Sequence, residues 1–100
     1  AQGAPLIIDI EALYPTPFGP ASPSRSATAT IVFRILEDAA ISVRLFNVLG
    51  QALVLLHEGY YPAGSHSFTY TPGIDFQSGT YFLALAASDR VRWVRILYLR

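Results

Sequence analysis

The stretch from Ala40 to Gly59 (AISVRLFNVLGQALVLLHEG) constrains the fold of this chain more than any other. Its first half alternates with a period of two, with Ile41, Val43 and Leu45 on one side and Ser42, Arg44 and Phe46 on the other. That period is typical of a half-buried β-strand. Asn47-Val48-Leu49-Gly50 then predicts a tight turn, because Asn and Gly tolerate positive φ. The stretch therefore predicts a β-hairpin.

The second half of this hairpin, from Gln51 to His57, is apolar on both sides. Ala52, Val54 and Leu56 would share one side of the strand, and Leu53 and Leu55 the other. A strand of this kind is either covered on both faces or left open for a partner. The sequence leaves both interpretations open.

The rest of the chain carries the same short period. The further strands are expected at Leu6–Leu13, Ala27–Leu36, Ser65–Tyr70, Thr80–Ala87 and Arg90–Arg100, separated by turn-forming segments, with Tyr60–Gly64 expected as a loop. No window of eleven residues favours a period of 3.6, so we expect essentially no helix. Seven or so strands at this spacing predict an all-β fold, an antiparallel β-sandwich.

The N-terminal strand and the segment after it differ from the remainder. In Leu6–Leu13, one side would carry Leu6, Ile8, Ile10 and Ala12, and the other Ile7, Asp9, Glu11 and Leu13. Residues 14–26 hold four of the seven prolines, so this connector is expected to join no ladder and to cross as an extended loop, with Phe18 inserted into the core rim. We expect one domain, composed of strand 1–13, connector 14–26 and sandwich 27–100.

Composition excludes several partners. Seven arginines balance seven acidic residues and lysine is absent, so no net charge attracts nucleic acid. Cysteine is absent, and no apolar run approaches the ~20 residues of a membrane-spanning helix. The chain begins Ala-Gln-Gly without methionine, which either removal of a secretory signal or a trimmed boundary explains. We expect a secreted protein with no nucleic-acid partner and no membrane-spanning segment.

No cluster of reactive side chains is apparent. His57 and His66 lie outside any zinc-binding spacing, so ordinary polar roles are expected. Asp9 and Glu11 share a strand side, but no loop supplies the six to eight oxygens that Ca²⁺ takes. We expect no catalysis, no cofactor and no metal.

Four arginines gather in the closing strand, interleaved with Trp93 and Tyr98. Arg95 would face opposite to Arg90 and Arg92, which argues against a nucleic-acid surface of the stacking type. Charged residues that protect an apolar strand from unwanted pairing explain the arginines more simply.

Several segments, in order, resemble one family. They are Tyr14-Pro15-Thr16-Pro17-Phe18, Ala29-Thr30-Ile31-Val32-Phe33, Val43-Arg44-Leu45-Phe46-Asn47-Val48-Leu49-Gly50, Pro62-Ala63-Gly64-Ser65-His66 and Ser78-Gly79-Thr80-Tyr81-Phe82, with Arg100 at the end. Together they are similar to the C-terminal sorting domains of the type nine secretion system and to the Ig-like domain of flagellar hook-capping proteins. The resemblance covers Leu13 to Arg100.

This resemblance implies a seven-stranded Ig-like sandwich that is secreted and non-catalytic. Thr16 stands where the family favours Asn, Asn47 stands where it favours Asp, and the loop from Pro72 to Gln77 is longer than usual. These departures leave open whether a secretion machinery reads this C-terminus. In the family, the domain serves as the export and surface-attachment tag of a larger cargo.

Two functions follow as expectations. In the first, the chain is a secreted structural subunit that self-associates into an extracellular filament or surface layer, with Leu6–Leu13 as a donor strand added to a neighbour's sheet. In the second, it is a sorting domain whose partner is the secretion machinery. Whether Leu6–Leu13 pairs within or between chains is left open. The candidate assembly residues are Leu6, Ile7, Ile8, Ile10, Leu13, Leu53, Leu55, Trp93, Ile96 and Tyr98.

Overall fold

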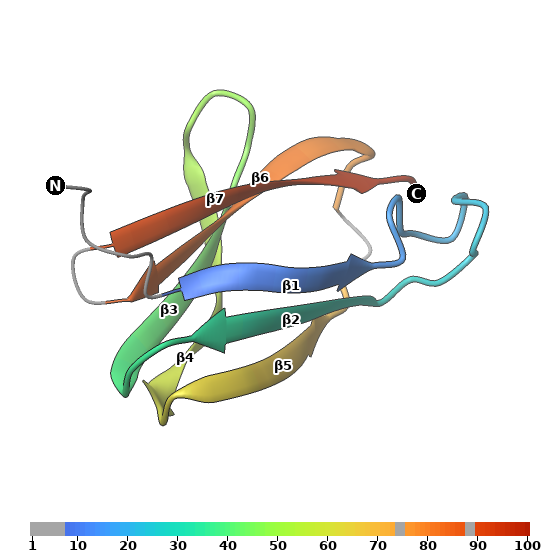
Figure 1. Ribbon diagram of the computed structural model, residues 1–100. Helices are drawn as coiled ribbons and strands as arrows, with labels where there is room; N and C mark the ends of the chain where they lie inside the picture. The colour runs from blue at the N-terminus through green and yellow to red at the C-terminus, as the bar shows by residue number, and fades with distance from the viewer. Residues whose placement is uncertain (1–7, 74–75, 88–89) are drawn as a thin grey trace, which may run out of the picture.

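A computed structural model describes residues 8–73, 76–87 and 90–100 of the chain (Figure 1). Seven strands make up the fold: β1 Ile8–Tyr14, β2 Ala29–Ile35, β3 Ala39–Phe46, β4 Ala52–Tyr61, β5 Gly64–Tyr70, β6 Gly79–Ala87 and β7 Arg90–Tyr98. The described residues contain no helix. The expected all-β architecture is therefore confirmed.

The strands form two antiparallel sheets that face each other. One sheet has the order β1-β2-β5 and the other the order β4-β3-β6-β7 (Figure 1). In the constant-type immunoglobulin domain the fourth strand pairs with the fifth, in the sheet of the first two strands. Here β4 instead pairs with β3 along its length, because the tight turn between them makes a hairpin. The described residues form a seven-stranded β-sandwich with four strands in its larger sheet.

The core follows the alternation of β2 and β3. Alternate residues of these strands are almost fully buried: Ala29, Ile31, Phe33 and Ile35 in β2, and Ala39, Ile41, Val43 and Leu45 in β3. The central strand β6 opposes β3 with Leu83 and Leu85, which are also buried. Because side chains alternate between the two faces of a strand, each of these strands supplies one row to the core.

The hairpin turn forms at the predicted residues. The Asn47 carboxamide oxygen accepts hydrogen bonds from the N–H groups of Leu49 and Gln51 at 2.9 and 3.0 Å. Gly50 adopts a φ of 84°, which glycine tolerates and most residues do not. Beyond the turn, β4 continues to Tyr61 rather than ending at His57. The expectation of a loop over Tyr60–Gly64 was therefore wrong for Tyr60 and Tyr61, and also for Gly64, which begins β5. The reason is that β3 begins at Ala39 and pairs as far as Tyr61.

Strand β1 pairs with β2 of its own chain, from Ile8 opposite Ile35 to Tyr14 opposite Thr30. The register shifts between Ile10 and Ala12, so Glu11 forms a bulge. The expected faces were therefore wrong after the bulge: Leu13, not Ala12, packs against the core together with Ile10. Leu6 and Ile7 of the predicted strand lie outside the described residues.

The proline-rich connector is tied to the larger sheet. Phe18 is buried, as expected, and its ring lies 5.0 Å from that of Tyr98. The expectation that the connector joins no ladder was wrong, because the Phe18 N–H donates to the Leu97 carbonyl at 3.1 Å and the Leu99 N–H to the Phe18 carbonyl at 2.8 Å. Proline lacks an N–H, but Phe18, which lies between Pro17 and Gly19, keeps one. The connector thus closes one end of the sandwich.

Candidate interaction surface

Half of the residues expected at an assembly surface belong to the interior. Ile8, Ile96 and Tyr98 are buried in the core, and Ile10 and Leu13 are partly buried against it. These positions were wrong as surface candidates, because β1 and β7 each direct one side toward the opposite sheet. Leu6 and Ile7 fall outside the described part of the chain.

The remaining three candidates are exposed on the larger sheet. The exposed fractions of Leu53, Leu55 and Trp93 are 46, 43 and 55%. Leu55 and Trp93 lie on the side of the sheet that faces away from β1, β2 and β5, because their ladder partners Arg44 and Ala84 alternate with core residues. We call this side of β4, β3, β6 and β7 the outer face.

Pairing registers place the outer-face residues in rows across the four strands. In the order β4, β3, β6, β7, successive rows are Ala52, Phe46, Phe82 and Arg95, then Leu55, Arg44, Ala84 and Trp93, then Glu58, Ser42, Ala86 and Val91. Leu97 follows beyond Arg95 on β7. Three charged side chains, Ser42 and Thr80, which pairs with Leu97, therefore interrupt a face that is otherwise apolar.

Two aromatic rings form a ridge on this face. The rings of Phe46 and Trp93 lie 5.0 Å apart between centroids at an angle of 61°, although the two residues sit on strands separated by β6. Ala84 of β6, the ladder partner of Trp93, has a small side chain that is only 9% exposed. Edge-to-face contact of this kind holds the rings in place. The aromatic ridge, Phe46 with Trp93, is thus an ordered apolar projection.

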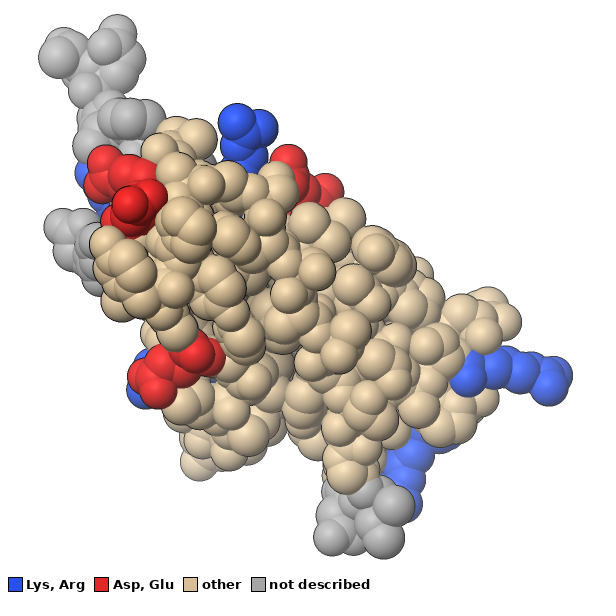
Figure 2. Space-filling model, turned by 90° about the horizontal axis from the view of Figure 1, so that it is seen from below, with Lys and Arg blue, Asp and Glu red and all other residues tan. Residues whose placement is uncertain are grey.

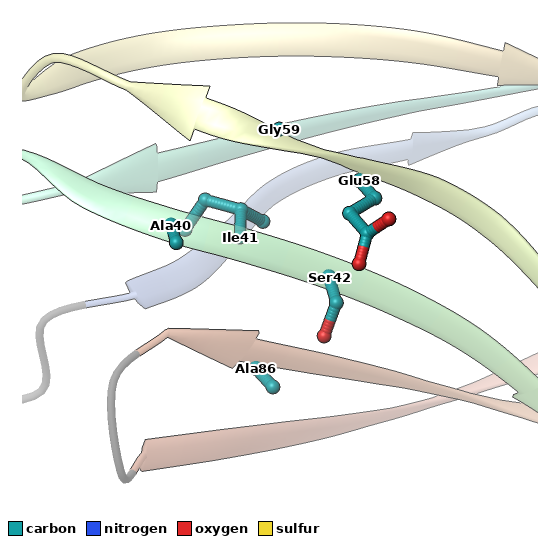
Figure 3. Close-up of a pocket in the computed structure, with 6 residues that line it drawn as sticks. All are labelled: Ala40, Ile41, Ser42, Glu58, Gly59 and Ala86. Atoms are coloured by element: carbon teal, nitrogen blue, oxygen red, sulfur yellow. The ribbon is translucent and has the colours of Figure 1, made fainter.

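A hollow lies beside the ridge on the same face. It has a volume of about 240 Å³ and is lined by Ala40, Ile41, Ser42, Glu58, Gly59 and Ala86 (Figure 3). Small side chains on three neighbouring strands create it, because none of them fills the space above the backbone. In Figure 3 the Glu58 carboxyl group points toward Ser42. The hollow therefore combines apolar walls with one carboxylate and one hydroxyl group.

The charged groups of the outer face have no partner within the described residues. Arg44, Arg95 and Glu58 are exposed there and make neither a hydrogen bond nor an ion pair with any of them. On the opposite side of β7, Arg92 is different: its Nε lies 3.0 Å from Asp9 Oδ1 of β1. Arg95 and Arg92 thus face opposite ways, as expected.

The tip of the β3–β4 hairpin is a second exposed apolar region. Val48 and Leu49 at the turn are 65 and 79% exposed. Val54 pairs with the buried Leu45 and so faces the inner side, yet it is 40% exposed. Figure 1 shows that the tip of this hairpin projects beyond β1, β2 and β5. The sequence left two interpretations, a strand covered on both faces or one open for a partner. At this end of β4 the strand is open.

The histidines take part in aromatic packing at the junction of β4 and β5. The His57 ring stacks on Phe68 with centroids 4.8 Å apart and forms a hydrogen bond with the Tyr61 hydroxyl. His66 Nε2 lies 2.7 Å from the Pro62 carbonyl oxygen.

Figure 2, a view from the side of β5, shows charged side chains at the periphery and none at the centre.

Asp9 and Glu11 diverge rather than forming a site. Asp9 reaches Arg92, whereas Glu11 Oε1 accepts a hydrogen bond from Ser65 Oγ at 2.6 Å. Residues 8–73, 76–87 and 90–100 contain no group of three His, Cys, Asp or Glu side chains that could hold a metal ion. These two carboxylates are therefore partnered within the sandwich.

An aromatic cluster closes the end of the sandwich near the C-terminus. Phe76 stacks on Tyr81 at 4.4 Å and also contacts Tyr98 and Tyr70. Burial raises the pKa of Tyr70 and of Tyr81 above the ordinary value of 10.0, and nearby tyrosines add to the shift. A shallow hollow of about 280 Å³ next to it is lined by Pro20, Ala27, Pro72, Gly73, Tyr98 and Arg100.

Comparison of the sequence with protein-family models and with curated proteins found no match. In the described ranges there is no helix with the length and apolar character needed to cross a membrane.

Sequence reasoning overlooked several members of the outer face. Phe46, Phe82, Val91 and Leu97 were not among the candidate residues, although all four belong to it. The alternation of β3 already placed Phe46 opposite the core residue Leu45. What the sequence could not supply was the order of the strands, which brings Phe46 and Trp93 together across β6.

Proposed function

We propose that this chain is a non-catalytic module that acts by protein–protein assembly, with the outer face as its docking surface. The observation that carries this proposal is the apolar character of that face on a sheet whose opposite side already supplies the core. Leu55, Val91, Trp93 and Leu97 are each at least 37% exposed there, and Phe46 and Phe82 are half-buried.

Burial of such a face stabilises a complex through the hydrophobic effect. Removal of apolar surface from water contributes roughly 25 cal/mol per Å². Large continuous apolar patches are unusual on monomeric proteins and mark interaction surfaces. An ordered aromatic ridge also loses little conformational entropy on binding. These properties fit a subunit of an extracellular filament or surface layer.

Docking through the outer face leaves β1 in its own sheet. Donor-strand linkage would require β1 to leave β2 and would expose the site of the buried Ile8. Contact through an already exposed face needs no such rearrangement. We therefore favour this face over Leu6–Leu13 as the assembly element.

Electron microscopy and light scattering test the assembly directly. The wild-type chain is compared with a double variant, Leu55→Thr with Trp93→Thr, and with Leu36→Thr, which alters an equally exposed apolar residue outside the sheet. We expect assemblies from the wild type and Leu36→Thr but separate particles from the double variant. Assemblies of unchanged size and number from the double variant would contradict the proposal.

A second candidate, a sorting domain for the type nine secretion system, draws support from where the resembling segments lie. Asn47–Gly50 forms the hairpin turn, and Gly64 and Gly79 begin β5 and β6 at φ values of 131° and 153°. The test is a reporter protein carrying residues 1–100 at its C-terminus in a bacterium that uses this system. Surface attachment of the reporter supports sorting, and its retention inside the cell excludes it.

A further inference from the structure

The outer face carries both a projection and a hollow of its own. Trp93 projects from β7, and the hollow lies on β4, β3 and β6, with Ser42 and Ala86 at its near edge one row further along. An indole ring suits a hollow with apolar walls, and the Ser42 hydroxyl and Glu58 carboxylate offer acceptors to the indole N–H. One copy of the chain therefore presents both halves of a complementary contact.

The rows define the rotation that joins these halves. Adjacent strands are ~4.8 Å apart and successive rows ~6.8 Å apart along a strand. From the midpoint between Arg44 and Ala84, Trp93 thus lies ~7 Å across the strands, and the Ser42–Ala86 edge of the hollow lies ~7 Å along them. A two-fold axis through this midpoint, in the plane of the face and at ~45° to the strands, exchanges the two positions.

The same axis also joins opposite charges. Arg95 and Glu58 occupy opposite corners of the three rows, three strands and two rows apart. These separations are each ~14 Å, so the corners also exchange under rotation about the ~45° axis. Each Arg95 then faces the partner's Glu58. Neither side chain has an ion-pair partner among the described residues of its own chain.

We propose that the occupant of the outer face is a second copy of this chain, in a two-fold dimer. Trp93 of each copy enters the other's hollow beside Ser42 and Ala86, and Arg95 pairs with Glu58 across the interface. This inference rests on the proposed function, because it names the partner of that surface. The strands of the two sheets cross at ~90°, one of the two preferred geometries of packed sheets.

The size of the face suits such a dimer. Four strands ~4.8 Å apart and eight residues long, as in β3, cover roughly 500 Å² before side-chain relief is counted. The smaller specific interfaces bury about 600 Å² per partner. A dissociation constant in the micromolar range is therefore expected, about 1–100 μM. A two-fold contact closes on itself, so a filament would need a further contact, for which the hairpin tip is available.

Arg44 is the exception to the complementarity and sharpens the test. It lies beside the proposed axis, so the two Arg44 side chains would approach each other. Like charges at an interface oppose association. Replacement by an uncharged residue of similar length, Arg44→Gln, is therefore expected to tighten the dimer about threefold or more.

Charge exchange tests the pairing of Arg95 with Glu58. Sedimentation equilibrium should show dimers for the wild type and dissociation constants raised at least about tenfold for Arg95→Glu and for Glu58→Arg. An equimolar mixture of these two variants should dimerise again. In the mixed dimer, one ion pair joins the two introduced residues with reversed charges, and the other joins the unchanged Arg95 and Glu58. The double variant should also dimerise. Arg34→Glu, on the smaller sheet, is the matched control and should behave as wild type.

The hollow is tested by filling it. Ala86→Phe should abolish dimers, whereas Thr69→Phe, which adds the same ring to the smaller sheet, should not. Trp93 is the only tryptophan, so its fluorescence reports the interface directly. Its emission should shift to shorter wavelength as wild-type protein is concentrated, and the shift should be absent in Ala86→Phe. Circular dichroism confirms that each variant is folded.

The outcomes separate this inference from the proposed function. A wild-type monomer at all concentrations up to about 1 mM overturns self-association, but leaves docking to a different protein intact. A dimer that is insensitive to the Arg95, Glu58 and Ala86 variants overturns the inference as well, because the copies then meet elsewhere. The proposed function fails on its own test, when the Leu55 and Trp93 variant assembles normally.

Discussion

The outer surfaces of the two sheets differ sharply although both sheets share one core. On β1, β2 and β5 the outward residues include Thr30, Arg34, Ser65, Ser67 and Thr69, and Glu11 bonds to Ser65 above β2. On the larger sheet the outward residues include Phe46, Phe82, Trp93 and Val91. A polar outer surface needs no cover, whereas an apolar one gains free energy from a partner. The comparison shows that, among the described residues, the outward side of the larger sheet is more apolar than that of the smaller one, and this is the surface that we propose for docking.

The largest loss of stability is expected from substitutions in the core that the two sheets share. Phe33 is completely buried and contacts Phe68 and Tyr61, whereas Phe46 is half-buried on the outer face. Phe33→Ala should lower the free energy of unfolding by about 3–5 kcal/mol, because a large cavity remains. Phe46→Ala should lower it by about 1 kcal/mol, the size of one ring contact. Urea denaturation measures both, and equal losses would break the distinction between core and outer face.

Substitutions that make the outer face polar are expected to change stability less but to reduce the binding of an apolar dye clearly. Leu55→Thr with Trp93→Thr should reduce the binding of a fluorescent apolar dye severalfold and change the free energy of unfolding by about 1 kcal/mol or less. Val32→Thr on the smaller sheet is the matched control. Dye titration provides the measurement. If the Val32 variant lowers dye binding and the double variant does not, the dye binds to the smaller sheet, and the proposed patch is not the apolar surface.

Alkaline pH probes the tyrosines at which the sheets meet. Burial raises the pKa of Tyr70 on β5 and of Tyr81 on β6 above 10.0. The unfolded chain therefore loses these protons first, so stability is complete below pH 10 and falls as pH rises through the folded-state values. Thermal unfolding from pH 8 to 11.5 should show this decline.

The matched variants for this pH dependence are Tyr70→Phe and Tyr81→Phe, which should flatten the decline. Tyr60→Phe changes an exposed tyrosine away from the cluster and should leave it unaltered. A decline that persists unchanged in the Tyr70 and Tyr81 variants would assign it to other groups.

The smallest effect is expected at the ion pair between the sheets. Asp9 of β1 and Arg92 of β7 pair at 3.0 Å, with side chains 52 and 45% exposed. Exposed pairs contribute ~0.2–1 kcal/mol and are screened by salt. Asp9→Asn should therefore lower the melting temperature by a few degrees at low salt and less at 1 M NaCl. A loss that is independent of salt would show that packing, not charge, joins the sheets there.

Much of the fold could be predicted from local patterns. The alternation in β2 and β3 identified their core-facing residues, and Asn47–Gly50 identified the turn. The bulge at Glu11 could not be predicted, because one extra residue in a strand is specified by the partner strand rather than by local preference. The docking of Phe18 onto β7 also depends on a strand eighty residues later in the chain.

The candidate surface was predicted less well than the fold. Leu53, Leu55 and Trp93 are exposed, but Ile8, Ile96 and Tyr98 are buried. Apolar character alone does not distinguish a residue that faces the other sheet from one that faces solvent. That assignment needs the register, since a shift of one residue exchanges the two faces of a strand.

The chain's own pattern of residues thus specified strands and turns, because these depend on neighbours within a few positions. Tertiary structure decided which apolar rows became core and which became surface. It did so by placing β4 beside β3 in the larger sheet rather than beside β5, and by bringing Phe46 and Trp93 together across β6. These contacts join residues far apart in the chain, and only the packed sheets bring them together.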